Sequence, residues 1–228
     1  MLSPALRWAG RPSYELHFDG SAQIKFEDPY DAVNDWWCSL FFKPDTNFFA
    51  GSPSTQYITG KYDDATNYLY LYLQSLSGAL ILQHREGNGA ESVSSTKVSW
   101  SANTWYHILA SISTTNGMRL RVNGGTADME AAKQTAISLT NDFVIGTNID
   151  TGTSGFKGII KNVIMDDTAL SAANELELSK GITVTTPKNI FRLDEGHGLI
   201  AYDKGSGADN GTLDASCLWR QGQRLYVR

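Results

Sequence analysis

Short segments of alternating residues, separated by polar and glycine-rich turns, constrain the fold of this chain more than any other feature. The clearest is Tyr68-Leu69-Tyr70-Leu71-Tyr72-Leu73. Since successive side chains of a β-strand point to opposite faces, this segment places three tyrosines on one face of a sheet and three leucines on the other. Turns separate the segments at intervals of about 8–12 residues, a spacing typical of an all-β sandwich.

Further strands are predicted wherever an apolar run stops at turn residues. The run from Trp36 to Phe42 ends at Lys43-Pro44-Asp45, and Asn123-Gly124 forms a tight turn after another run. One short helix is predicted over residues 172–178, because Ser171 is a good N-cap and Gly181 follows its last turn. The strands are predicted over residues 14–18, 36–42, 68–73, 79–82, 105–112, 118–122, 143–146, 156–165 and 189–193.

Composition and charge exclude several classes of partner. The 228 residues carry a formal net charge of −5 and no run of basic residues, which argues against nucleic acid. There is no apolar run long enough to insert into a membrane, and the N-terminus lacks the pattern of a signal peptide. We expect Cys38 and Cys217 to be free thiols, with one disulfide between them as the alternative.

Four stretches follow one another in a recognisable order. They are residues 16–21, residues 39–45, residues 105–110 with 120–124, and residues 145–146 with 156–163 and 169–171. Together they resemble the laminin-G-like jelly rolls of the concanavalin A-like lectin/glucanase superfamily. The resemblance implies an all-β fold, a two-sheet antiparallel jelly-roll sandwich with one short helix and with loops gathered at its ends.

The chain is predicted to divide into a jelly roll over residues 1–182 and a β tail over residues 183–228. In the tail, Phe191 to Leu213 is similar to a segment that usually precedes the jelly roll in related domains. The tail either completes the chain's own sheets or pairs with a neighbouring subunit. The first is favoured because the termini of a sandwich often lie close together, and the second would make the protein a homo-oligomer.

The sequence lacks the acid pairs that hydrolases of this superfamily use. Such enzymes place two carboxylates roughly 5–10 Å apart across a cleft. The neighbours Asp63-Asp64, Asp166-Asp167 and Asp194-Glu195 point to opposite sides of an extended strand. Glu175 and Glu177 fall on the predicted helix, where they diverge. We therefore predict that the protein is not an enzyme, with a polysaccharide hydrolase as an alternative.

Calcium is the only metal that the resemblance suggests, because several relatives hold it at the rim of the sandwich with loop carboxylates and carbonyls. Asp19, Asp203 and Asp209 lie in glycine-rich turns and are the candidate ligands. Aspartates in such turns usually cap their own backbone, and that role is favoured here.

The candidate ligand surface combines aromatic and hydrogen-bonding residues. Residues 47–57 form a predicted loop of this kind, and the tyrosines of residues 68–73 offer a second surface, although sheet packing explains them equally well. Rings that stack on apolar sugar faces suit glycans, and the same mixture suits a protein surface. The predicted ligand-binding residues are Phe48, Phe49, Gln56, Tyr57, Tyr68, Tyr70 and Tyr72.

These observations predict a recognition module that binds a glycan or a protein surface without catalysis. A lectin-like domain without an export signal fits delivery by assembly. We therefore expect a bacteriophage virion component of the surface, head fibre or tail that aids host attachment, with the cytoplasm as the other location. The main alternative is a structural decoration subunit of the particle that has no sugar site.

Overall fold

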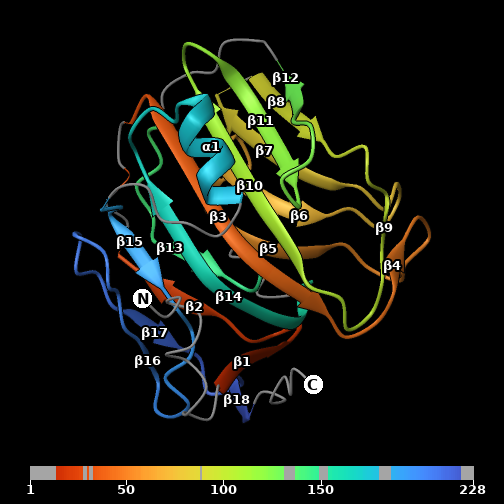
Figure 1. Ribbon diagram of the computed structural model, residues 1–228, viewed down its shortest axis with the longest axis vertical. Helices are drawn as coiled ribbons and strands as arrows, with labels where there is room; N and C mark the ends of the chain where they lie inside the picture. Colours follow the sequence, from red (N-terminus) through yellow and green to blue (C-terminus); the bar gives the residue numbers. More distant parts are fainter. Residues whose placement is uncertain are drawn as a thin grey trace, which may run out of the picture.

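The computed structural model describes residues 14–27, 30, 33–87, 89–130, 137–148, 154–179 and 186–221. Two large antiparallel sheets pack face to face over these residues, and one short helix lies outside them (Figure 1). The predicted fold class is therefore confirmed. Among the described residues, no helix is long and apolar enough to cross a membrane.

Within the described residues, the first sheet contains eight strands, seven of them in one continuous path and β15 paired beside them on β14. In spatial order the path is β12 (Asp128–Glu130), β11 (Gly117–Val122), β10 (Tyr106–Ser113), β3 (Asp35–Pro44), β14 (Lys157–Asp166), β1 (Tyr14–Asp19) and β18 (Leu218–Gln221), with β15 spanning Asn189–Phe191. β1 and β15 occupy successive positions along one edge of β14.

Over the same described part of the chain, the second sheet also contains eight strands, and a small two-stranded sheet lies at the rim. The order of the second sheet is β16 (Ile200–Ala201), β17 (Gly211–Leu213), β2 (Ile24–Phe26), β13 (Phe143–Ile145), β5 (Gln56–Asp64), β6 (Asn67–Leu73), β7 (Leu80–Glu86) and β8 (Gly89–Ser94). The small sheet pairs β4 (Phe48–Phe49) with β9 (Ser99–Trp100).

The core lies between the two sheets because the strands alternate as the sequence predicts. On β6 the three leucines are buried in the core, whereas the tyrosines face outward. Trp36 of the first sheet stacks on Phe143 of the second, with ring centroids 5.7 Å apart. Each large side chain buried in this way contributes roughly 1.5–3 kcal/mol.

Strand β5 was not predicted, and its sequence explains why. The segment contains Gly60 and Lys61, which are poor strand signals, and its register with β6 shifts at two places. Each shift interrupts the alternation that identifies a strand from sequence. The predicted loop over residues 47–57 therefore ends earlier, because β5 begins at Gln56.

Helix α1 (Ala172–Ser179) covers part of the outer face of the first sheet (Figure 1). The Ser171 hydroxyl accepts a hydrogen bond from the backbone N–H of Asn174 at 3.2 Å, so the predicted N-cap is confirmed. Leu178 packs on Trp37 and Leu109, which point outward from β3 and β10. The helix thereby covers apolar side chains on the outer face of the first sheet.

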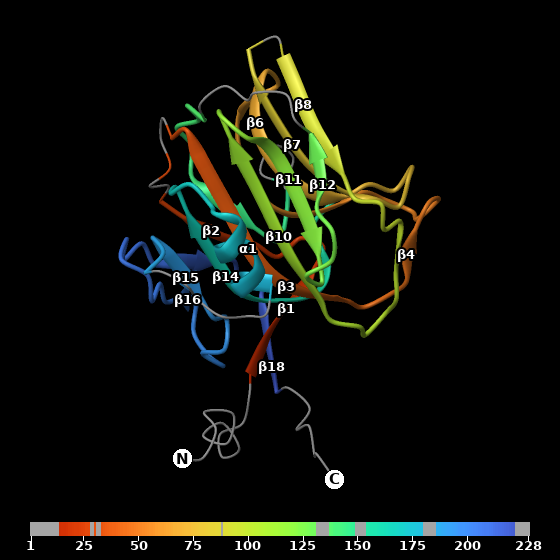
Figure 2. The same ribbon diagram turned by 45° about the horizontal axis from the view of Figure 1, so that its top comes forward.

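In this single chain, the tail contributes strands to both sheets. Leu16 of β1 pairs with Trp219 of β18, and the two strands lie side by side in Figure 2. Thr212 of β17 pairs with Lys25 of β2 in the other sheet. Pairing of the tail with a neighbouring subunit stays a prediction. Cys38 and Cys217 are both free thiols, as predicted, and both are buried. Burial raises the pKa of the Cys217 thiol to about 12.

Candidate functional site

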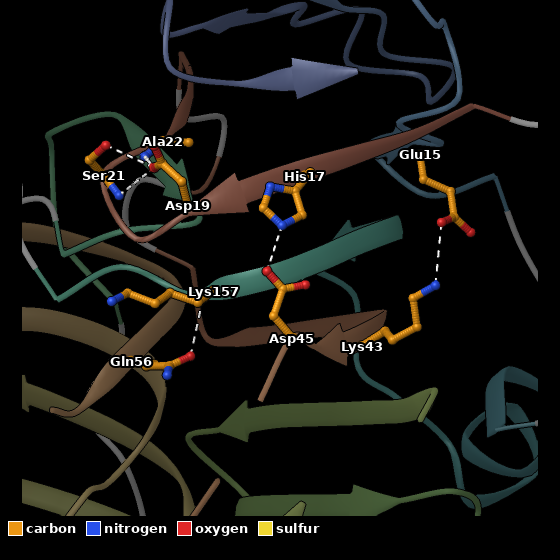
Figure 3. A network of polar contacts seen from close by, with 9 residues as sticks. All are labelled: Glu15, His17, Asp19, Ser21, Ala22, Lys43, Asp45, Gln56 and Lys157. Atoms are coloured by element: carbon orange, nitrogen blue, oxygen red, sulfur yellow. Dashed lines mark hydrogen bonds and ion pairs between the residues drawn. The ribbon is translucent and has the colours of Figure 1, made fainter. Parts of the chain in front are cut away.

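Two of the seven predicted ligand-binding residues do not face a ligand surface. Phe48 is 1% exposed and belongs to the core, because its strand β4 turns that side chain inward and Phe49 outward. Gln56 is buried as well, and its Oε1 accepts a hydrogen bond from the backbone N–H of Lys157 at 3.1 Å, which ties β5 to β14 (Figure 3). The burial of Phe48 in the core contradicts its predicted role, whereas Gln56 is engaged in a bond between the two sheets. A predicted loop could not show which way either side chain points. Phe49 is exposed at the rim.

The other four predicted residues lie together on the outer face of the second sheet. Tyr57 comes from β5, and Tyr68, Tyr70 and Tyr72 come from β6. Tyr62 of β5 joins them, because it pairs with Tyr68 across the two strands. We call these five residues the tyrosine face. Tyr62 was not predicted as a ligand-binding residue because β5 was not predicted as a strand.

The rings of the tyrosine face pack in a continuous array. Tyr70 is central: its ring centroid lies 4.9 Å from that of Tyr68, 5.0 Å from that of Tyr57 and 6.3 Å from that of Tyr62. Tyr57 also stacks on Tyr72 at 5.2 Å. As a result Tyr70 and Tyr72 are less than 10% exposed, whereas the outer three tyrosines are half-buried and present ring surface. Burial raises the pKa of Tyr72 to about 12, so its hydroxyl stays protonated at neutral pH.

Gly60 makes room for this array. A Cβ atom at this position would lie 2.4 Å from the carbonyl oxygen of Leu69 and 2.7 Å from the ring of Tyr70. Contacts under 3.0 Å are not tolerated without movement of the neighbours. Glycine therefore allows the Tyr70 ring to lie across the backbone of β5.

Polar groups surround the rings. The Tyr72 hydroxyl donates to Gln83 Oε1 at 3.1 Å, and the Tyr70 hydroxyl lies 3.4 Å from Asn148 Oδ1. Beyond Gln83, its β-sheet partner Ser92 is exposed on β8. Amides and hydroxyls beside aromatic rings are the combination that recognises a sugar, whose hydroxyls need partners while its C–H face needs an apolar surface.

Comparison with protein families agrees with this architecture. Residues 18–174 match the laminin G family described as the concanavalin A-like lectin/glucanases superfamily. The match covers more than half of the chain. The chain belongs to this superfamily. No curated protein sequence matches this member of the superfamily.

Solved structures show the same fold. A candidate carbohydrate-binding protein from Bacteroides ovatus superposes on this laminin G-like chain with a TM-score of 0.65 at 17% identity, over 94% of this chain and 61% of that one. Domain 4 of a GH43 extracellular arabinanase from Geobacillus stearothermophilus, solved in complex with arabinotriose, gives a TM-score of 0.57 at 15% identity, over 73% and 87%. This chain thus spans about three fifths of the Bacteroides ovatus protein.

Domains LG4-5 of the mouse laminin α1 chain give a TM-score of 0.54 at 14% identity, over 68% of this chain and 41% of that one. At these identities the similarities establish the shared fold alone. Which ligand the chain binds has to be argued from its own residues.

The three aspartates predicted as calcium ligands are not gathered into one site. Asp19 Oδ1 accepts hydrogen bonds from the backbone N–H and the hydroxyl of Ser21, both at 2.8 Å, and these bonds lower its pKa (Figure 3). Asp203 lies in the tail and accepts a bond from the backbone N–H of Asp209 at 3.1 Å. Over the described residues, no group of three or more His, Cys, Asp or Glu side chains could hold a metal.

Several of the acids considered for catalysis are held in structural bonds. Glu175 is buried and accepts from Arg119 at 2.9 Å and from Arg121 at 2.7 Å, which fastens α1 to β11. Asp64 caps its own turn through the N–H and hydroxyl of Thr66, and hydrogen bonds lower its pKa to about 2. These carboxylates serve the fold in the positions where the structure places them.

Proposed function

We propose that this laminin G-like domain is a non-catalytic module that binds a neutral glycan on its tyrosine face. The observation that carries the proposal is the array of five tyrosine rings on the outer face of β5 and β6, built over Gly60. A core role is excluded for these rings, because the leucines of β6 fill the core on the other side of the same strand.

The chemistry of the face selects the class of ligand. Among the outward side chains of β6 and its neighbour β7, the charged group is Arg85, whose guanidinium donates to the carbonyl of Ala65 at 2.9 Å. At the end of β5, Asp63 and Asp64 accept hydrogen bonds from the backbone N–H groups of Thr140 and Thr66. A protein partner or an acidic glycan would require more charge or a larger exposed apolar area than this face offers. Stacked rings beside amides and hydroxyls suit a neutral sugar chain.

Tyr68→Ala tests the proposal, since its ring is half-buried at the outer edge of the array. Titration calorimetry with neutral polysaccharides, arabinan among them, should give a Kd for the unaltered chain. Loss of one stacking ring should raise that Kd about tenfold. Tyr202→Ala is the matched control, because Tyr202 is 45% exposed and lies on the tail, and its Kd should not change.

Equal weakening by both variants would contradict the placement of the site. Failure of the unaltered chain to bind any neutral glycan would instead favour a structural decoration subunit. A role on a virion surface, in a head fibre or in a tail remains part of the proposal, and detection of the chain in purified particles would test it.

A further inference from the structure

A second cluster of aromatic and charged side chains lies on the outer face of the first sheet, on the opposite side of the sandwich from the tyrosine face. It consists of Trp105, Lys43 and Lys161, which we call the basic cluster. Lys43 projects from β3 and Lys161 from β14, which are adjacent strands, and Trp105 immediately precedes β10 on the other side of β3.

Both ammonium groups converge on the indole of Trp105. Lys161 Nζ lies 4.0 Å from the ring centroid and Lys43 Nζ lies 4.9 Å from it. The two charges are therefore no more than about 9 Å apart, close to the Debye length of about 8 Å at physiological ionic strength, so salt screens their repulsion only in part. The attraction between ammonium and ring holds both lysines in place.

The carboxylates near the cluster do not balance these charges. Glu15 Oε2 lies 3.4 Å from Lys43 Nζ (Figure 3), and within the described part of the chain Lys161 forms no ion pair. Asp45 on the same face lies 2.6 Å from His17 Nε2. Burial lowers the pKa of Lys161 and the nearby Lys43 lowers it further, while Glu15 opposes the shift. Two fixed cations thus share one acid.

We propose that the basic cluster binds the anionic group of an acidic sugar, either a carboxylate or a sulfate. An anion placed between the two ammonium groups would relieve their repulsion and would form charge-assisted hydrogen bonds with both. Trp105 acts as a positioning residue, because it orients the lysines toward the ligand. The site is distinct from the tyrosine face, so it does not depend on the neutral-glycan proposal.

The negative net charge of the chain makes non-specific binding of a polyanion unfavourable. A protein with a formal net charge of −5 repels polyanions at long range, so binding of a polyanion requires a local site. Such binding should weaken as ionic strength rises, because each anion that is bound releases counterions.

The test is titration of the full chain with polygalacturonate, dextran sulfate and neutral dextran at low and physiological ionic strength. We expect a salt-sensitive Kd for at least one polyanion and none for dextran, and the preferred polyanion identifies the group as carboxylate or sulfate. Lys161→Met and Lys43→Met should each raise that Kd about tenfold, since each removes one charge-assisted contact. Lys161→Arg should retain binding.

Lys25→Met is the matched control, because Lys25 pairs with Asp142 on the second sheet, and it should leave the Kd unchanged. Melting temperatures show whether Lys161→Met still folds. If it does not, the Kd values of Lys161→Arg and Lys43→Met decide whether the basic cluster binds the polyanion. Absence of binding to both polyanions, or an equal effect of Lys25→Met, would overturn the proposal. Tighter binding of polyglutamate than of either polysaccharide would overturn the assignment to sugars. Tyr68→Ala should not affect this binding, which separates the failure of one site from the failure of the other.

Discussion

Asp203 provides the sharpest test of whether the tail aspartates cap the backbone or hold calcium. Its carboxylate accepts four hydrogen bonds from one stretch of the tail. Oδ1 accepts from the N–H groups of Ile190 and Gly205 at 2.7 and 2.8 Å, and Oδ2 accepts from Asn189 Nδ2 and the Asp209 N–H at 2.9 and 3.1 Å. The carboxylate thereby ties the loop between β16 and β17 to strand β15.

Asp203→Asn keeps the shape of the side chain and removes one accepting oxygen, so two of the four donors lose their partner. Hydrogen bonds to a charged group contribute about 1.5–3 kcal/mol each, and the half-buried position reduces this, so we expect a loss of about 2–4 kcal/mol. For a domain of this size the melting temperature should fall by roughly 5–15 °C.

The measurement is thermal and urea denaturation of the variant and the unaltered chain, each with calcium and with EDTA. The matched control is Asp209→Asn, because Asp209 contributes its backbone N–H to the network and the substitution leaves that group in place. If Asp203 caps the backbone, only its own variant is destabilised and EDTA has no effect. Equal destabilisation by both variants, together with a fall in melting temperature in EDTA, would refute the capping role and support calcium.

Gly60 and Lys61 are neighbours on β5, beneath the rings of the tyrosine face. Gly60→Ala should destabilise the fold by about 1–3 kcal/mol and abolish binding of neutral glycans, because its Cβ displaces Leu69 or the Tyr70 ring. Urea denaturation measures the loss of stability and calorimetry measures the loss of binding. A Gly60→Ala variant that binds neutral glycans with an unchanged Kd would contradict the role of Gly60. Lys61 is fully buried, donates to the carbonyl of Leu139, and has a pKa lowered by burial to about 8. Since the unfolded chain binds this proton more tightly, stability should rise between about pH 8 and pH 10, and Lys61→Met should remove that rise in urea titrations.

Much of the fold could be predicted because its signals are local. The alternation of residues 68–73, the Asn123-Gly124 turn and the Ser171 cap each depend on a few adjacent residues, and the structure contains all three. The order of the four resembling stretches then pointed to the superfamily that the family comparison confirms. By contrast, β5 was missed because register shifts interrupt its alternation.

The candidate site was predicted only in part. Sequence alone determined that the tyrosines of β6 share one face, since strand geometry fixes which side chains lie together. Only the tertiary structure decided that Tyr57 and Tyr62 join them, that Phe48 enters the core and that Gln56 ties two sheets together. The same holds for the basic cluster, whose members come from β3, from β14 and from the residue that precedes β10. The alternation of side chains along a strand depends only on neighbouring residues, whereas the pairing of distant strands depends on how the whole core packs.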